Sequence, residues 1–120
     1  MKVLCMCQGG NTRSVSLKFL LKMHYDIDAL ACGWEYNTEE TRQMLYQWAD
    51  RIIVLHDDFA EYVPEAFHHA SDGTRKLHQF HVGDDIWTGS GGAFHPDLLH
   101  KLTLMLHERG DAIFRKTGAG

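Results

Sequence analysis

Short apolar runs alternate with helix-length amphipathic patterns along this chain of 120 residues. Arg51–His56 is the clearest strand, because its centre is β-branched and continuously apolar, as in strands buried within a parallel sheet. Lys2–Met6 and Asp28–Cys32 are two further candidate strands, and Lys76–Val82 is a weaker one. Helix-length patterns separate these strands, and such an order predicts an α/β protein with a parallel sheet and helices on both faces. We expect one domain over residues 1–120.

Apolar residues at intervals of three and four predict the helices. The first follows Ser14, and the last begins at Pro96, which suits the first turn of a helix. Another begins with a capping box, with Asn37 as N-cap and Glu40 three residues later. The stretch 59–70 is less regular, because a proline interrupts it. The apolar faces are predicted to contain Leu17, Leu20 and Leu21 in the first helix, Thr41, Met44, Leu45 and Trp48 in the next, and Leu98, Leu99, Leu102, Met105 and Leu106 in the last.

Charge and composition exclude several classes of protein. Sixteen acidic against twelve basic residues give a formal charge of −4, which disfavours a general nucleic-acid binder. No run approaches the roughly 18 apolar residues of a membrane helix, and the apolar start lacks the basic stretch and cleavage site of a signal peptide. The three cysteines, an odd number, do not suggest a disulfide framework. We expect a soluble, cytoplasmic protein with neither nucleic-acid nor membrane partners.

Nine histidines raise the question of a metal site. His78 and His81 are three residues apart on an expected strand, so their side chains should point to opposite faces. His100 and His107 have no carboxylate or thiol between them at ligand spacing. We therefore expect solvated histidines and no metal.

The segment from Cys7 to Ser14 joins the first expected strand to the first expected helix. Gly9 and Gly10 allow the backbone to curl so that successive N–H groups point inward. The helix N-terminus adds its positive end, and the Arg13 guanidinium can hold two phosphate oxygens together. The segment therefore predicts an oxyanion site, in which the other substrate-binding positions are Gln8, Asn11, Thr12 and Ser14.

Cys7 lies at the mouth of this expected site, where the field that attracts phosphate also favours a thiolate. A thiolate beside a phosphate monoester can attack phosphorus and form a phosphocysteine intermediate. Ser14 can donate a hydrogen bond to the sulfur. The loop is not a Walker phosphate loop, since no Gly-Lys-Ser/Thr follows its glycines, and it lacks the Gly-x-Gly-x-x-Gly pattern of dinucleotide sites.

Cys-x5-Arg-Ser between a first strand and a first helix resembles the low-molecular-weight protein tyrosine phosphatases, especially their short, divergent microbial members. The similarity continues through Asp28–Gly33 and Trp48–Leu55, which look like that family's second and third strands. It covers most of the chain, loosely after Asp58. The resemblance implies a flavodoxin-like, three-layer α/β/α fold with a four-stranded parallel sheet and no cofactor. It also implies that the substrate is a phosphotyrosine protein or a small aryl phosphate.

The family protonates the leaving phenolate with an aspartic acid on a late loop, usually in Asp-Pro followed by an aromatic residue. The segment Asp84–Trp87 resembles that setting, with isoleucine in place of proline. The resemblance implies that Asp85 is the general acid and that Trp87 lies beside the substrate. Asp84 is adjacent and stays an alternative. Trp34, Tyr36 and Trp87 either form the walls of an aryl phosphate cleft or cover the core.

The loop departs from the family pattern at two positions. Gly10 stands where the family commonly has asparagine, which falls one place later at Asn11, and Thr12 stands where it commonly has a second cysteine. Cys5 shares a strand face with Cys7 and could trap an oxidised sulfur. The simpler interpretation is that Cys5, like Cys32, is a buried structural residue.

These patterns together predict a cysteine-dependent phosphomonoester hydrolase, a protein tyrosine phosphatase. Cys7 attacks, Arg13 binds the phosphoryl group, and Asp85 manages the leaving-group proton. The alternative is a phosphate- or phosphoprotein-binding module on the same fold that has little or no turnover, because the loop is altered. An arsenate reductase is disfavoured, since its disulfide relay needs further cysteines and none follows Cys32.

Overall fold

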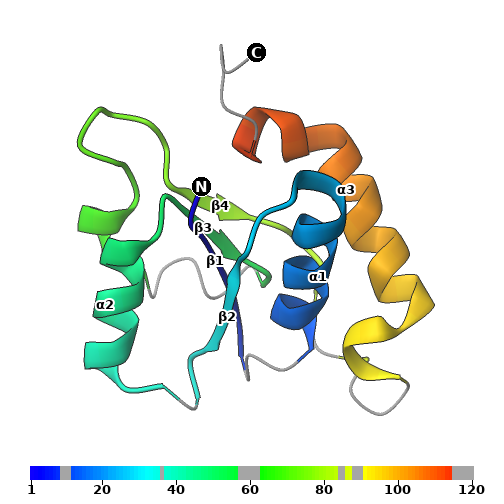
Figure 1. Cartoon of the computed structure of the whole chain (residues 1–120). Coiled ribbons are helices and arrows are strands. Elements are labelled where there is room, and N and C mark those ends of the chain that lie inside the picture. The colour runs from blue at the N-terminus through cyan, green and yellow to red at the C-terminus, as the bar shows by residue number, and fades with distance from the viewer. Residues whose placement is uncertain (9–11, 36, 57–62, 84–85, 88–90, 115–120) are drawn as a thin grey trace.

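Four parallel strands form the central sheet of the protein (Figure 1). The computed structural model describes residues 1–8, 12–35, 37–56, 63–83, 86–87 and 91–114. The spatial order of the strands is β2-β1-β3-β4, which is compatible with a flavodoxin-like layout. Their bounds are β1 Val3–Cys7, β2 Leu30–Gly33, β3 Arg51–Val54 and β4 Leu77–Gln79. The expected α/β class with a four-stranded parallel sheet is confirmed.

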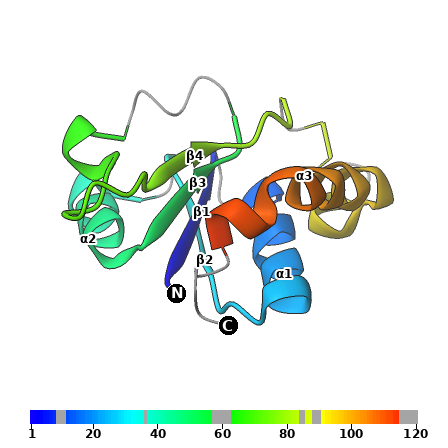
Figure 2. The ribbon, with the colours of Figure 1, turned by 90° about the horizontal axis from the view of Figure 1, so that it is seen from above.

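Helices cover both faces of the sheet (Figure 2). Two of them, α1 (Arg13–Tyr25) and α3 (Pro96–Phe114), pack on one face, and α2 (Glu39–Trp48) packs on the other. Short 3-10 helices are found at Glu65–Phe67 and Gly92–Phe94. Within the described residues, no helix is both long and apolar enough to cross a membrane.

The central strand β1 contributes to both cores. Its five residues are at most 2% exposed. Val3, Cys5 and Cys7 belong to the core beneath α1 and α3, whereas Leu4 and Met6 belong to the core beneath α2. This alternation is the period of two that a strand imposes on its side chains.

The helix starts agree with the sequence patterns except at α2. Its N-cap is Thr38, whose side-chain oxygen accepts a hydrogen bond from the Thr41 backbone N–H at 3.1 Å. The predicted N-cap, Asn37, is wrong, because its side-chain amide donates instead to the Gly33 carbonyl at 2.7 Å. A threonine cap in this position satisfies one free N–H of the first turn.

The predicted faces of α1 and α3 are confirmed, whereas that of α2 is partly wrong. In α1 and α3 the residues Leu17, Leu20, Leu21, Leu98, Leu102 and Leu106 are buried. In α2 the buried residue is Tyr46, and Met44 is 70% exposed. Leu45 and Trp48 are partly buried and pack against the core beneath α2.

Two predicted strands and one predicted helix are shorter in the structure. Both β3 and β4 end before the predicted boundaries, although Leu55 N–H still donates to the Met6 carbonyl and Phe80 N–H to the Val54 carbonyl, each at 2.9 Å. Of the predicted helix 59–70, residues 59–62 lie outside the described residues, and the remainder contains a single 3-10 turn.

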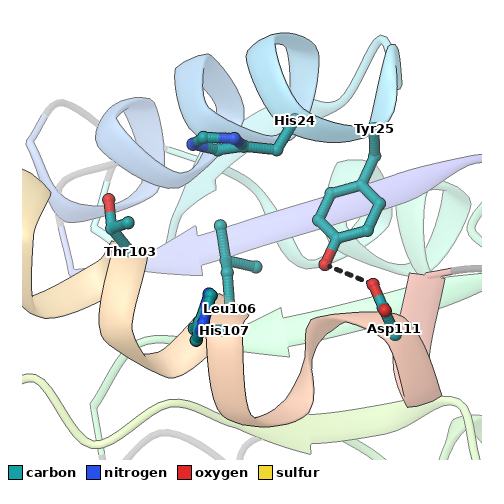
Figure 3. Close-up of a pocket in the computed structure, with 6 residues that line it drawn as sticks. All are labelled: His24, Tyr25, Thr103, Leu106, His107 and Asp111. Carbon is teal, nitrogen blue, oxygen red and sulfur yellow. Dashed lines mark hydrogen bonds between the residues drawn. The ribbon is translucent and has the colours of Figure 1, made fainter.

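The C-terminal halves of α1 and α3 meet around Tyr25. Its hydroxyl donates to Asp111 Oδ1 at 3.1 Å, and its ring lies 5.6 Å from that of Phe114. Figure 3 shows the adjoining cavity of about 450 Å³, which His24, His107 and Asp111 also line. Gly110 is the close-approach position, since a Cβ there would lie 2.1 Å from Tyr25 Oη.

We predict that Gly110→Ala lowers the free energy of unfolding by about 1–3 kcal/mol, because the added methyl group displaces the Tyr25 ring. In a Tyr25→Ala background the same substitution should become neutral or stabilising, by up to about 1 kcal/mol from helix propensity. Urea unfolding of the four proteins in this double-mutant cycle measures the difference. Equal effects in both backgrounds would contradict the packing described.

Candidate active site

Cys7 ends β1 at the carboxyl edge of the sheet, which is where open α/β sheets bind ligands. The backbone directly after β2 is hydrogen-bonded to the end of β1. The Trp34 N–H donates to the Cys7 carbonyl at 3.3 Å, and the Glu35 N–H donates to the Gln8 carbonyl at 3.1 Å. Because β1 lies between β2 and β3, Cys7 is also beside the point where the strand order reverses.

Cys7 and Ser14 are in direct contact. The thiol donates to Ser14 Oγ over 3.1 Å, and both residues are buried. When the sulfur is ionised, the hydroxyl can rotate and donate to it, since a serine hydroxyl both donates and accepts. The structure thus brings together the two side chains that the sequence pattern pairs.

Arg13 is a buried cation, with 1% of its surface exposed. One terminal amino group donates to the Gly83 carbonyl at 2.6 Å, and the buried Nε has no hydrogen-bond partner. Among the described residues, ion pairs within 4 Å involve only Lys22 and two aspartates. A buried guanidinium without a carboxylate partner is costly. An oxyanion bound beside Arg13 would supply the missing counter-charge.

The N-terminus of α1 lies beside the Cys7–Ser14 pair. In the described structure the first turn of this helix contains no acidic residue, and the Thr12 side chain makes no capping hydrogen bond. Acidic residues in the first turn would offset the positive end of the helix dipole. A helix start without acidic residues is suited to binding an anion.

The contact between Arg13 and Gly83 links residues 70 positions apart in the chain. Gly83 has φ +78°, a left-handed conformation that glycine adopts without strain. It directly precedes Asp84 and Asp85, which lie outside the described residues. The bond therefore holds Gly83, the residue before Asp84 in the chain, against the arginine, and no local sequence pattern signals this contact.

Gln8 is exposed, and its side-chain amide donates to Glu35 Oε1. The sequence analysis missed Glu35, although its position three residues after the predicted end of the second strand was an available signal. Trp34 is half-buried and packs against the core beneath α2. Gly9, Gly10, Asn11 and Tyr36, which are also candidate site residues, lie outside the described residues.

Trp87 belongs to the core beneath α1 and α3 and is 7% exposed. Its ring meets that of His95 edge to face, with the centroids 5.2 Å apart. These contacts favour the core-covering role over the cleft wall, and a contact of Trp87 with substrate stays a prediction.

The other two cysteines are in apolar surroundings. Burial raises the pKa of the Cys5 thiol far above its usual range, and the neighbouring Cys7 adds to this effect. Cys32 lies in the opposite core, and burial raises its pKa as well. Both environments favour the neutral thiol, which supports the interpretation of Cys5 and Cys32 as structural residues.

Histidines do not gather around a metal site in the described part of the chain, where no group of three His, Cys, Asp or Glu residues has a suitable arrangement. None of the nine histidines is fully buried. Burial lowers the pKa of His78 to about 4.

Comparison of the chain with family models, with curated proteins and with solved structures finds no match.

We predict that iodoacetamide at neutral pH labels Cys7 and spares Cys5, whose thiol is fully buried and has a raised pKa. Inorganic phosphate should slow the labelling of Cys7 several-fold, because a bound anion covers the sulfur. Peptide mass spectrometry locates the label, with Cys7→Ser as the control. Labelling of Cys5 as fast as Cys7, or no protection by phosphate, would argue against this site.

Proposed function

We propose that this protein is a cysteine-dependent phosphomonoester hydrolase of the low-molecular-weight tyrosine phosphatase type. The observation that carries the proposal is the buried guanidinium of Arg13, which has no carboxylate partner in the described structure, on the residue that precedes Ser14, the hydrogen-bond partner of Cys7. A phosphoryl dianion matches this charge, and a sulfur beside it is placed to attack phosphorus.

In the first step the Cys7 thiolate attacks phosphorus and the bond from phosphorus to the leaving oxygen breaks. Asp85 donates a proton to that oxygen, so the alcohol or phenol leaves neutral. In the second step water attacks the phosphocysteine, Asp85 takes a proton from it, and the sulfur leaves as thiolate. Ser14, at 3.1 Å, donates a hydrogen bond to the departing sulfur.

Transition-state charge is stabilised from two sides. Arg13 presents a planar fork to two phosphoryl oxygens, and the free N–H groups at the start of α1 are donors for the remaining oxygens. Donors already fixed in a site with little water stabilise developing charge strongly. The burial of Arg13 and the packing of Ser14, both at most 1% exposed, support this preorganisation.

The assignment of Asp85 draws support from the Arg13–Gly83 bond. The Gly83 carbonyl lies 2.6 Å from an Arg13 terminal nitrogen, and Asp85 follows Gly83 by two residues, so the covalent chain limits how far Asp85 can be from the arginine. Asp84 is subject to the same restraint, and the leaving-group experiment below separates the two.

The proposed substrate is a phosphotyrosine protein or a small aryl phosphate. A second candidate function is a phosphate-binding module without turnover. The 2% exposure of Cys7 favours this alternative, because a buried sulfur restricts access. The assay distinguishes the two functions.

We predict chelator-resistant hydrolysis of p-nitrophenyl phosphate that Cys7→Ser abolishes. Arg13→Lys should lower kcat by about 10²–10³-fold, because lysine cannot reproduce the bidentate fork. The absorbance of released p-nitrophenolate measures both effects.

Arg75→Lys is the matched control, since Arg75 is exposed and outside the candidate site. Phosphate binding without turnover would assign the chain to the binding module, and hydrolysis that survives Cys7→Ser would remove the cysteine mechanism.

We predict that Asp85→Ala slows hydrolysis by about 10²–10⁴-fold for alkyl phosphates, which have poor leaving groups, and much less for p-nitrophenyl phosphate. A good leaving group departs without a proton, so it gains little from the acid. Asp84→Ala is the matched control. A leaving-group dependence that appears in Asp84→Ala instead would move the general acid by one residue.

A further inference from the structure

A second cavity, of about 450 Å³, lies at the amino ends of the strands, away from Cys7. It is bounded by the turn between α2 and β3 and by the turn that precedes β4; both are at the upper end of the sheet in Figure 1, whereas β1 runs down toward Cys7. A cavity of this size is typical of small-molecule sites. Its polar lining comes from Gln47, Asp50, Arg51, Ser71, Asp72, Thr74 and Lys76.

Lys76 is the unusual member of this lining, because it is only 8% exposed. In the described structure its ammonium donates no hydrogen bond, and its nearest aromatic contact is the Phe67 ring, whose centroid is 5.8 Å away. Burial lowers the pKa of Lys76, Asp50 partly opposes this effect, and Lys2 adds to it. A desolvated ammonium with so few partners favours a bound anion.

The two carboxylates at the cavity already have donors. Asp50 Oδ2 accepts from the Lys2 N–H at 2.8 Å, and Asp72 Oδ1 accepts from the Thr74 N–H at 2.9 Å. The hydrogen bonds from Thr74, with a smaller contribution from Arg51, lower the pKa of Asp72. Both aspartates are exposed, so water solvates their charge, whereas the Lys76 side chain is mostly buried and only its end reaches the cavity.

Arg51 is a second cation at the cavity, and part of its guanidinium is available to a ligand. Its Nε donates to the Ile113 carbonyl at 3.1 Å and one terminal nitrogen donates to the Asp50 carbonyl at 2.9 Å. Those acceptors are neutral backbone carbonyls, so its charge is not cancelled by them. The other terminal nitrogen makes no hydrogen bond within the described residues.

We propose that this cavity binds a small anion, through a carboxylate or phosphate group held by Lys76 and Arg51. Ser71 supplies a hydroxyl donor beside it. The site is separate from the proposed phosphatase centre, because it lies at the opposite ends of the parallel strands. The proposed anion site does not depend on the proposed phosphatase function.

The test is an NMR titration of the full chain with citrate and, separately, with inorganic phosphate. We expect saturable shifts of the Thr74 and Lys76 amide signals, and a rise of the Lys76 ammonium pKa on saturation because the charge gains a partner. Sodium chloride at equal ionic strength is the control. Saturation by only one of the two probes identifies which anionic group the cavity accepts.

Lys76→Met should abolish the saturable shifts, and Lys101→Met, which removes an exposed lysine on α3, should leave them intact. Lys76→Gln replaces the first variant if it does not fold. Shifts that fail to saturate with either probe, that match those in sodium chloride, or that persist in Lys76→Met would overturn the proposal. Signals from residues near Cys7 report any binding at the other site separately.

Discussion

The parallel pairing of β1 with β2 on one side and β3 on the other positions everything else in this protein. The register places Cys7 opposite Gly33 and Met6 opposite both Cys32 and Val54. A slip of one residue would exchange the side chains that enter the two cores, so burial of both faces fixes the register. Since the strands are parallel, their carboxyl ends meet at one edge, where Cys7 emerges beside the start of α1.

At this edge the chemistry depends on a charge that the fold encloses without cancelling. Arg13 is buried at the first position of α1, and its hydrogen bond runs to a neutral carbonyl at Gly83. A fold that leaves a guanidinium in this state is less stable without an anion than with one. The same principle applies more weakly to Lys76 at the other end of the sheet, where a mostly buried lysine lines a cavity.

Local patterns predicted most of the architecture, and long-range contacts account for the rest. The strand runs, the start of α3 at Pro96 and the faces of α1 and α3 follow from periodicity and capping chemistry. The choice of Thr38 over Asn37 as N-cap depended on the Asn37 amide reaching Gly33, which tertiary structure decides. For the candidate site, spacing alone paired Cys7 with Ser14, but not Arg13 with Gly83, which is 70 residues away.

The most direct test of the account is to find where the phosphoryl group resides during turnover. Acid quenching of the protein while it hydrolyses p-nitrophenyl phosphate, followed by peptide mass spectrometry, should show the phosphoryl group on the Cys7 sulfur and nowhere else. The Cys7→Ser protein should release no phosphate. A phosphoryl group on another side chain, or turnover with no phosphorylated cysteine at any time, would contradict the account.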